Sequence, residues 1–139
     1  MEVDARTLFV AVGGAETFDR IVARFYQGVS NDPALRPMYP EDLAESRRRL
    51  SLFLQQYFGG PPAYSQERGH PRLRMRHLPF AIGAAERNAW MRHMRAAVEA
   101  ERLPPAVETI LVDYFDRAAT FMINRADPGD DPGQAEAPE

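Results

Sequence analysis

The sequence predicts an all-α domain, and three observations support this fold class. Apolar residues recur at helical spacing in most segments before residue 126, glycine and proline clusters separate those segments, and no segment shows a convincing strand pattern. A chain of 139 residues suits one domain with one core. We therefore expect a helical domain over residues 1–125 and a disordered acidic tail over residues 126–139, which is rich in Pro, Gly, Asp and Glu.

The first half of the domain predicts three helices and a corner. A short helix over residues 4–12 stops at Gly13-Gly14, where the chain breaks sharply. The next helix has an inward face with helical spacing, formed by Phe18, Ile21, Val22, Phe25 and Val29. Asn31-Asp32-Pro33 ends that helix and starts a single turn, and residues 36–40 predict an extended corner because each proline biases its predecessor away from helix. A long helix follows over residues 41–58, with an inward face of Leu43, Leu50, Phe53, Leu54 and Tyr57.

The second half predicts a loop and three more helices. Residues 59–70 form the loop, and a short helix follows over residues 71–77. A long helix over residues 84–101 turns Trp90, Met94, Ala97 and Val98 inward. Pro104-Pro105 opens the last helix, since proline suits a first-turn position. Its predicted inward face consists of Val107, Ile110, Leu111, Tyr114, Ala118 and Phe121.

The composition excludes several classes of protein. No apolar run approaches the roughly 18–20 residues that cross a bilayer, and the acidic N-terminus does not resemble a signal peptide, so we expect a cytoplasmic protein without a membrane partner. The absence of cysteine excludes disulfides, thiolate nucleophiles and Cys-ligated metals. All 17 basic residues are arginine, and residues 1–125 contain 15 acidic residues. This nearly even charge gives no strong attraction to nucleic acid.

The three histidines differ in their setting. His70 lies at a loop-to-helix junction, and His93 lies on a long helix, where a surface or partly packed position is expected. His77 closes a short helix, so its imidazole can offer one nitrogen to a metal while the other N–H bonds to the freed carbonyl of Leu73. Taken alone, a surface position remains the simpler interpretation of His77.

Motifs along most of the chain change that interpretation. They are Ala11-Val12-Gly13-Gly14, Arg24-Phe25-Tyr26, Met38-Tyr39-Pro40-Glu41, Gln56-Tyr57-Phe58-Gly59-Gly60-Pro61, the run from Gly69 to His77, and Glu86-Arg87-Asn88-Ala89-Trp90. With these motifs, residues 8–123 resemble the truncated haemoglobins, and within them the second group. The resemblance implies a two-over-two helical sandwich around haem b and its iron. Phe58 departs from the pattern, since the group usually shows tryptophan there.

The resemblance also implies roles for individual residues. His77 matches the proximal iron ligand, and the distal ligand-binding positions are matched by Tyr26, Tyr39, Ser46 and Trp90. Without the resemblance, the aromatic residues among these read as core with a satisfied polar tip. Haem propionates need cations or donors at the pocket mouth, and the candidates are Arg49, Tyr64 and Arg76. For Arg72, Arg74 and Arg76 a solvated face is the alternative. The macrocycle would be lined by Leu50, Phe53, Leu54, Phe80 and Met94, each of which also suits plain core.

The implied function is reversible binding of dioxygen and other small diatomic ligands, with distal donors favouring slow release. Oxygen storage or transport is one role, and haem redox catalysis, peroxidase-like or in nitric-oxide or reactive-oxygen detoxification, is the alternative. The sequence leaves open a separate reductase and a homodimer. Two rivals from other classes are a nucleic-acid binder using Arg68, Arg72, Arg74 and Arg76, and a helical interaction module without cofactor.

Overall fold

The computed structural model describes residues 4–72, 75, 77 and 80–124, and every regular element among them is helical. The helices are α1 (Leu8–Ala11), α2 (Ala15–Ser30), the 3-10 helix η1 (Arg36–Met38), α3 (Ala44–Tyr57), α4 (Ala63–Arg68), α6 (Ala84–Glu99) and α7 (Pro105–Phe121). The predicted all-α class is confirmed. The predicted tail over residues 126–139 and most of the predicted short helix over residues 71–77 lie outside the described residues, although Met75 and His77 are helical.

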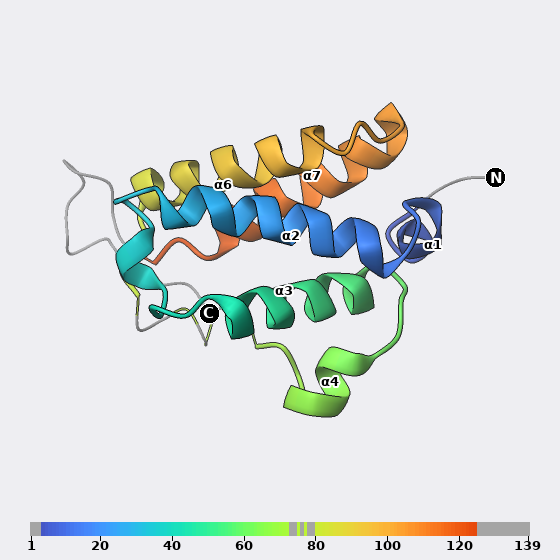
Figure 1. Cartoon of the computed structure of the whole chain (residues 1–139), viewed down its shortest axis with the longest axis horizontal. Helices are drawn as coiled ribbons and strands as arrows, with labels where there is room; N and C mark the ends of the chain where they lie inside the picture. Colours follow the sequence, from blue (N-terminus) through green and yellow to red (C-terminus); the bar gives the residue numbers. More distant parts are fainter. Residues whose placement is uncertain (1–3, 73–74, 76, 78–79, 125–139) are drawn as a thin grey trace.

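The long helices form two packed pairs, as Figure 1 shows. One pair is α2 with α3 and the other is α6 with α7, and the two pairs meet where α2 packs on α6. Helices α2 and α6 run in opposite directions, because Arg24 meets Glu101 near one end of the contact and Asp32 meets His93 near the other. This arrangement is the expected two-over-two sandwich.

Helix α2 supplies much of the core, and its predicted inward face is confirmed. Its apolar stripe is at most 1% exposed and consists of Phe18, Ile21, Val22, Phe25 and Val29. Burying a side chain of this kind contributes about 1.5–3 kcal/mol relative to leaving it exposed. Gly14 precedes the helix with a φ of 82°, a conformation that glycine adopts without steric cost. The glycine pair therefore determines where α2 begins.

Several predicted boundaries were wrong. The short helix predicted over residues 4–12 covers only Leu8–Ala11, and the helix predicted over residues 84–101 ends at Glu99. The long helix predicted from residue 41 begins at Ala44. Just before it, Asp42 Oδ1 accepts a hydrogen bond from the Ala44 N–H at 2.9 Å, so this segment forms a turn and not the first turn of the helix. Part of the predicted loop over residues 59–70 is helix α4. Gln56 holds that helix from α3, since its Oε1 accepts from Ser65 N at 2.8 Å and its Nε2 donates to Ser65 Oγ at 2.7 Å.

Two aromatic side chains predicted to face inward are exposed. Tyr57 is 44% exposed at the end of α3, and Phe121 is 54% exposed at the end of α7. In α7 the buried positions recur every four residues, at Val107, Leu111, Phe115 and Ala119. Phe121 follows Ala119 by two residues and so lies on the opposite side of the helix. None of the helices over the described residues is long and apolar enough to cross a membrane.

Helix α1 packs against the chain just after α3, and the second glycine pair permits this contact. A Cβ atom added at Gly59 would lie 1.8 Å from the carbonyl oxygen of Arg6, and its φ of 99° also favours glycine. The Phe9 N–H donates to the Phe58 carbonyl at 2.8 Å, and Phe58 itself is fully buried. Gly59-Gly60 therefore allows the N-terminal segment to pack on Phe58.

Candidate functional site

A cavity of about 330 Å³ lies between the two helix pairs. Its volume falls in the roughly 300–1,000 Å³ range of ligand and cofactor sites. It brings together most of the predicted site residues, namely Tyr26, Tyr39, Ser46, Arg49, Leu50, Phe53, Leu54, Tyr64, His77, Phe80 and Trp90. Met94 is fully buried but is not part of the cavity wall, and Arg76 lies outside the described residues.

Three aromatic residues with polar tips meet on one part of this wall. Tyr26 comes from α2, Tyr39 from the corner after η1, and Trp90 from α6. The rings of Tyr26 and Tyr39 are nearly perpendicular, with centroids 5.5 Å apart. Phe25 and Phe115 pack on the Trp90 ring at centroid distances of 5.1 and 5.9 Å, so the indole is held from two sides. Residues from three separate elements thus converge on one volume.

Burial keeps both phenols neutral. It raises the pKa of Tyr26 far above the ordinary value of 10, with Tyr39 adding to the rise and the charge of Arg49 opposing it. Burial also raises the pKa of Tyr39 to about 12, while a side-chain hydrogen bond with Trp90 opposes part of that rise. At neutral pH each phenol therefore keeps an O–H donor, and the indole of Trp90 supplies an N–H donor.

The corner that carries Tyr39 is fixed by its own backbone contacts. The prediction of an extended corner over residues 36–40 was wrong for Arg36–Met38, which form η1, since Pro37 fits the first turn of a helix. Tyr39 itself is extended, with φ −121° and ψ 152°, as expected directly before Pro40. The Arg36 guanidinium donates to the carbonyls of Tyr39 at 3.2 Å and Pro40 at 2.9 Å. These bonds leave the Tyr39 backbone little freedom to move.

His77 is half-buried and lines the same cavity. Its carbonyl accepts hydrogen bonds from Phe80 N at 3.0 Å and from Asn124 Nδ2 at 3.3 Å. Asn124 also donates to the Phe80 carbonyl at 2.8 Å and accepts from Ile82 N at 2.9 Å. Sequence reasoning missed Asn124, whose only signal is a polar side chain just after the last helix. The predicted carbonyl partner, Leu73, lies outside the described residues.

The other two histidines do not line this cavity. His70 is exposed, and its Nδ1 accepts from the Arg72 N–H at 3.1 Å, which agrees with the predicted junction role. His93 is partly packed, as expected, with Nε2 2.6 Å from Asp32 Oδ2. His77 is therefore the one histidine of the chain with access to the cavity.

The cavity wall also carries cationic and phenolic groups that suit an anionic ligand. Arg49 Nε is buried and makes no hydrogen bond to any described residue, and its nearest acidic oxygen, Glu45 Oε1, is 3.6 Å away. A buried donor without an acceptor is costly, so a carboxylate at this position would be stabilising. Tyr64 is 5% exposed on the same cavity, and Arg68, which was not predicted as a haem contact, lines it as well. These donors fit the propionates of a haem.

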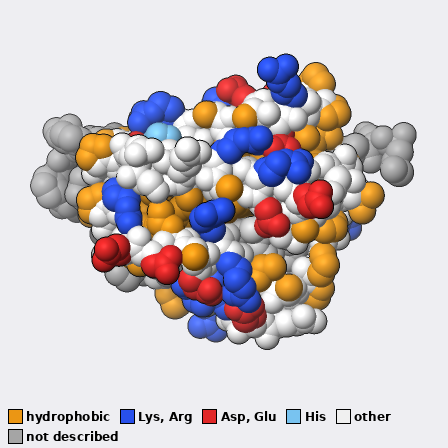
Figure 2. Space-filling model, viewed as in Figure 1, with side chains coloured by type: hydrophobic (Ala, Val, Ile, Leu, Met, Phe, Trp, Pro, Cys, Tyr) orange, Lys and Arg blue, Asp and Glu red, His pale blue; other side chains and the backbone are white. Residues whose placement is uncertain are grey.

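The outer face seen in Figure 2 mixes acidic and basic side chains along α2 and α3. On α3, the Arg48 guanidinium contacts Glu45 of the same helix and Glu67 of α4. A nucleic-acid binder needs basic residues concentrated on one face. The nucleic-acid alternative rests on other residues, of which Arg74 and Arg76 lie outside the described part of the chain.

Comparisons with known proteins agree with this geometry. The family described as bacterial-like globin matches residues 7–124. The chain is 38% identical over 117 residues to the group 2 truncated hemoglobin YjbI of Bacillus subtilis, covering 84% of this chain and 89% of that one. It is similar to the structure of a thermostable hemoglobin from Thermobifida fusca, with a TM-score of 0.83, 57% identity and coverage of 85% and 97%. It is also similar to a structure of a truncated oxygen-avid haemoglobin from Bacillus subtilis, with a TM-score of 0.81, 38% identity and coverage of 85% and 99%.

Proposed function

The chain belongs to the bacterial-like globin family as a group II truncated haemoglobin, and we propose that its cavity holds haem b and retains dioxygen or another small diatomic ligand for slow release. Membership of this family implies haem binding and ligand binding. The specific proposal concerns the residues: His77 as the iron ligand, and Tyr26, Tyr39 and Trp90 as donors to the diatomic ligand. Haem b is the form expected for a chain with no cysteine for covalent attachment of the cofactor.

One observation carries this proposal. A single cavity contains one of the three histidines and three neutral O–H or N–H donors from separate elements. A neutral imidazole is a common ligand of haem iron, and bound haem would supply a ferrous centre for diatomic ligands. The three donors suit a ligand that gains partial negative charge on binding. Apolar residues such as Leu54 and Phe53 keep the surroundings dry, which strengthens each hydrogen bond.

Other residues of the chain would help to hold the cofactor. Asn124 bonds to the carbonyls of His77 and Phe80 and so ties the segment around His77 to the end of α7. These bonds hold the backbone at His77 and so limit where its side chain can lie. Arg49 and Tyr64 would bind the propionates, because both place donors on the cavity wall where an acceptor is needed. Ser46 lines the cavity one turn before Leu50 and contributes a further hydroxyl.

Slow release follows from the number of donors around the ligand. Each hydrogen bond to a charged or partly charged group contributes about 1.5–3 kcal/mol, and these bonds must break before the ligand leaves. The Bacillus subtilis protein of known structure, which is 38% identical to this chain, is described as oxygen-avid, and this supports the proposal. Slow release suits retention, sensing or chemistry on the ligand better than rapid delivery. Turnover assays with peroxide and nitric oxide would separate retention from catalysis.

The proposal is tested by replacing the iron ligand. We expect wild-type protein to take up haem in a one-to-one titration with a strong Soret band. His77→Ala should lose stable haem retention, or retain haem only when imidazole is added to fill the space of the missing ring. His70→Ala is the matched control, since His70 is exposed and lies off the cavity, and it should keep the wild-type spectrum. A wild-type spectrum in His77→Ala would contradict the assignment of His77, and no Soret band in the wild-type titration would contradict haem binding.

A further inference from the structure

Asp32 and His93 connect the corner that carries Tyr39 to the helix that carries Trp90. His93 Nε2 lies 2.6 Å from Asp32 Oδ2, and the two side chains are only 21% and 11% exposed. A carboxylate can only accept a hydrogen bond, so the imidazole donates through Nε2. The His93 bond, with help from the Ala34 N–H, lowers the pKa of Asp32 below its ordinary value. The acceptor is therefore charged at neutral pH, which makes this a charge-assisted bond.

On the Asp32 side, the contact continues through the backbone to the cavity. Asp32 Oδ1 accepts from Ala34 N at 2.9 Å, and the Asp32 carbonyl accepts from Leu35 N at 3.1 Å and Arg36 N at 2.8 Å. Leu35 is 2% exposed and lines the cavity. The Arg36 guanidinium then binds the carbonyl of Tyr39 at 3.2 Å. Each link from Asp32 to Tyr39 is a hydrogen bond within one short segment.

On the His93 side, the contact leads to the cavity along one turn of α6. Trp90 precedes His93 by three residues, so both side chains lie on neighbouring parts of the same helix face. The Trp90 indole lies near the hydroxyl of Tyr39, where it lowers the pKa of that phenol against the rise caused by burial. The corner and α6 therefore meet twice, once at Tyr39 and Trp90 within the cavity and once at Asp32 and His93 outside it. The outer contact therefore joins the same two elements that carry Tyr39 and Trp90.

We propose that His93 and Asp32 are positioning residues for the ligand pocket, holding Tyr39 and Trp90 at the separation that lets both donate to a bound diatomic ligand. This inference rests on the proposed function, because it needs those two side chains to act on a ligand. Neither His93 nor Asp32 lines the cavity, so their effect must pass through the corner and α6. Arg92 also reaches Asp32 Oδ2 at 3.2 Å, but its side chain is 66% exposed and contributes less to the spacing.

Gly28 gives an independent reason to regard this contact as built into the fold. A Cβ atom added at Gly28 would lie 2.4 Å from His93 Nδ1 and 2.9 Å from its Cγ. The imidazole therefore packs directly against the backbone of α2, at a site that any larger residue would obstruct. Gly28→Ala should displace the ring without removing either polar partner. This variant therefore tests the position of the His93 ring while both hydrogen-bonding groups are still present.

The test compares variants of the haem-loaded protein by two readouts, the dioxygen dissociation rate from stopped flow and the infrared stretch of bound carbon monoxide. His93→Leu removes the contact, and Asp32→Asn replaces its charged acceptor with a neutral amide that retains Oδ1 for the Ala34 N–H. We expect both variants to speed dioxygen dissociation by roughly two- to thirtyfold, the range for residues that act on a site without touching the ligand. The carbon monoxide stretch should shift or broaden in the same direction as in Tyr39→Phe. Gly28→Ala should act likewise.

Two controls show whether any change reflects position or mere loss of stability. His93→Gln places an amide nitrogen near the position of Nε2 and should restore both readouts toward the wild-type values. Glu101→Gln weakens a contact among residues that do not line the cavity and should leave both readouts unchanged. The positioning role would be overturned, and the proposed function would stand, by one combination of results. His93→Leu and Asp32→Asn would keep the wild-type dissociation rate and carbon monoxide stretch, while Tyr39→Phe changes both. Unchanged readouts in Tyr39→Phe and Trp90→Phe as well would overturn the proposed role of the donors, and the inference with it.

Discussion

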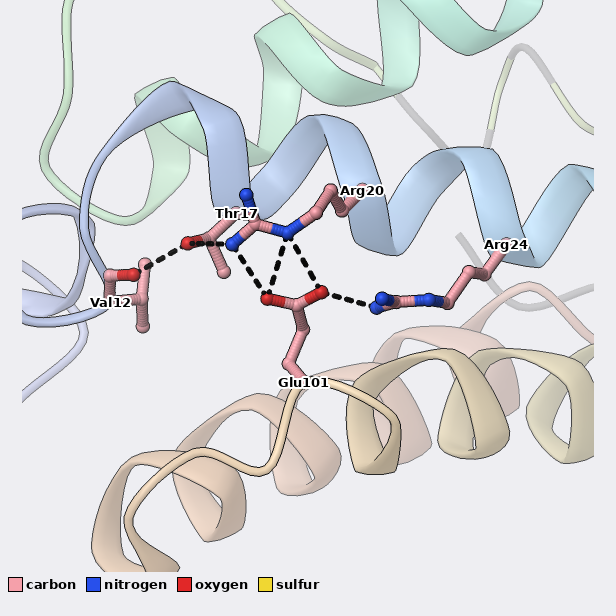
Figure 3. Close-up of polar contacts among 5 residues, drawn as sticks. All are labelled: Val12, Thr17, Arg20, Arg24 and Glu101. Carbon is pink, nitrogen blue, oxygen red and sulfur yellow. Dashed lines mark hydrogen bonds and ion pairs between the residues drawn. The ribbon is translucent and has the colours of Figure 1, made fainter.

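A carboxylate makes polar contacts at each end of the α2–α6 interface, but only one of these contacts joins the elements that carry Tyr39 and Trp90 of the cavity wall. At one end, Glu101 lies between Arg20 and Arg24, as Figure 3 shows. Arg20 Nη2 is 2.9 Å from Glu101 Oε1, and Arg24 binds the other carboxylate oxygen. At the other end, Asp32 accepts from His93. The two ends use similar chemistry, so their consequences depend on which elements they join.

The Glu101 end joins elements that lie away from the ligand pocket. Arg20 also donates to Thr17 Oγ1 at 3.2 Å, and Thr17 donates to the Val12 carbonyl at 2.6 Å, so the network ends at the turn between α1 and α2 (Figure 3). None of these residues lines the cavity. The Asp32 end, in contrast, continues to Tyr39 and Trp90. A carboxylate contact thus joins α2 to the chain just after α6 at one end, and at the other it joins the two elements that carry Tyr39 and Trp90.

The largest effect is expected where the cavity end meets the ligand, in Trp90→Phe. This change keeps an aromatic ring for Phe25 and Phe115 to pack on but removes the only indole N–H of the chain. A lost hydrogen bond to a partly charged ligand costs about 1.5–3 kcal/mol, or roughly ten- to over a hundredfold in dissociation rate. Dioxygen release by stopped flow should show this change. Carbon monoxide, which is less polarised, should respond less, and a dioxygen rate within a factor of two of wild type would make Trp90 only a wall of the pocket.

A smaller effect of a different kind is expected at the other end, in Glu101→Gln. The glutamine keeps one acceptor oxygen but loses the charge that faces two arginines. Because Arg20 is half exposed, screening reduces the loss, and we expect unfolding free energy to fall by about 1–2 kcal/mol. Urea unfolding measures this change, and dioxygen dissociation should stay at the wild-type rate. Altered dissociation in this variant would show that both ends of the α2–α6 contact control the pocket.

The smallest effect is the acid dependence of that stability difference. The hydrogen bond from Arg20, followed by that from Arg24, lowers the pKa of Glu101 below its ordinary value of 4.5. A carboxyl whose pKa is lowered in the folded state stabilises the protein above its unfolded pKa and loses that contribution as pH falls through its folded pKa. The difference between wild type and Glu101→Gln should therefore be constant near neutral pH and shrink below pH 4.5. A difference that grows in acid would assign the stabilisation to another group.

The fold was predictable from the sequence because local patterns determine most of it. The spacing of Phe18, Ile21, Val22, Phe25 and Val29 defines a buried helix face without any knowledge of its partners. Helix α4 was missed because the side chain of Gln56 on α3 holds it, and no local pattern shows that contact. Tyr57 and Phe121 were misplaced because a helix end does not reveal which side of its last turn faces the core.

The site was predictable only in part. His77, Tyr26, Tyr39 and Trp90 followed from a resemblance to a known family, and the structure brings them to one cavity. The contacts that position them were not predicted, because they join residues far apart in the chain. Asp32 and His93 are 61 residues apart, and Asn124 reaches the carbonyl of His77 across 47 residues. Such pairs depend on the packing of α2 on α6 and on where α7 ends, which single-sequence patterns do not contain.

In the proposed pocket, Tyr39 from the corner and Trp90 from α6 act together on one ligand. The most direct test is a double-mutant cycle of dioxygen dissociation by stopped flow, with Tyr39→Phe, Trp90→Phe and the double variant. We predict that each single change raises the dioxygen dissociation rate. In the double variant the rate should rise by less than the product of the two single increases, because the two side chains share one ligand and interact with each other. Multiplicative effects would mean that the two side chains act independently, and no effect in either single variant would contradict the account.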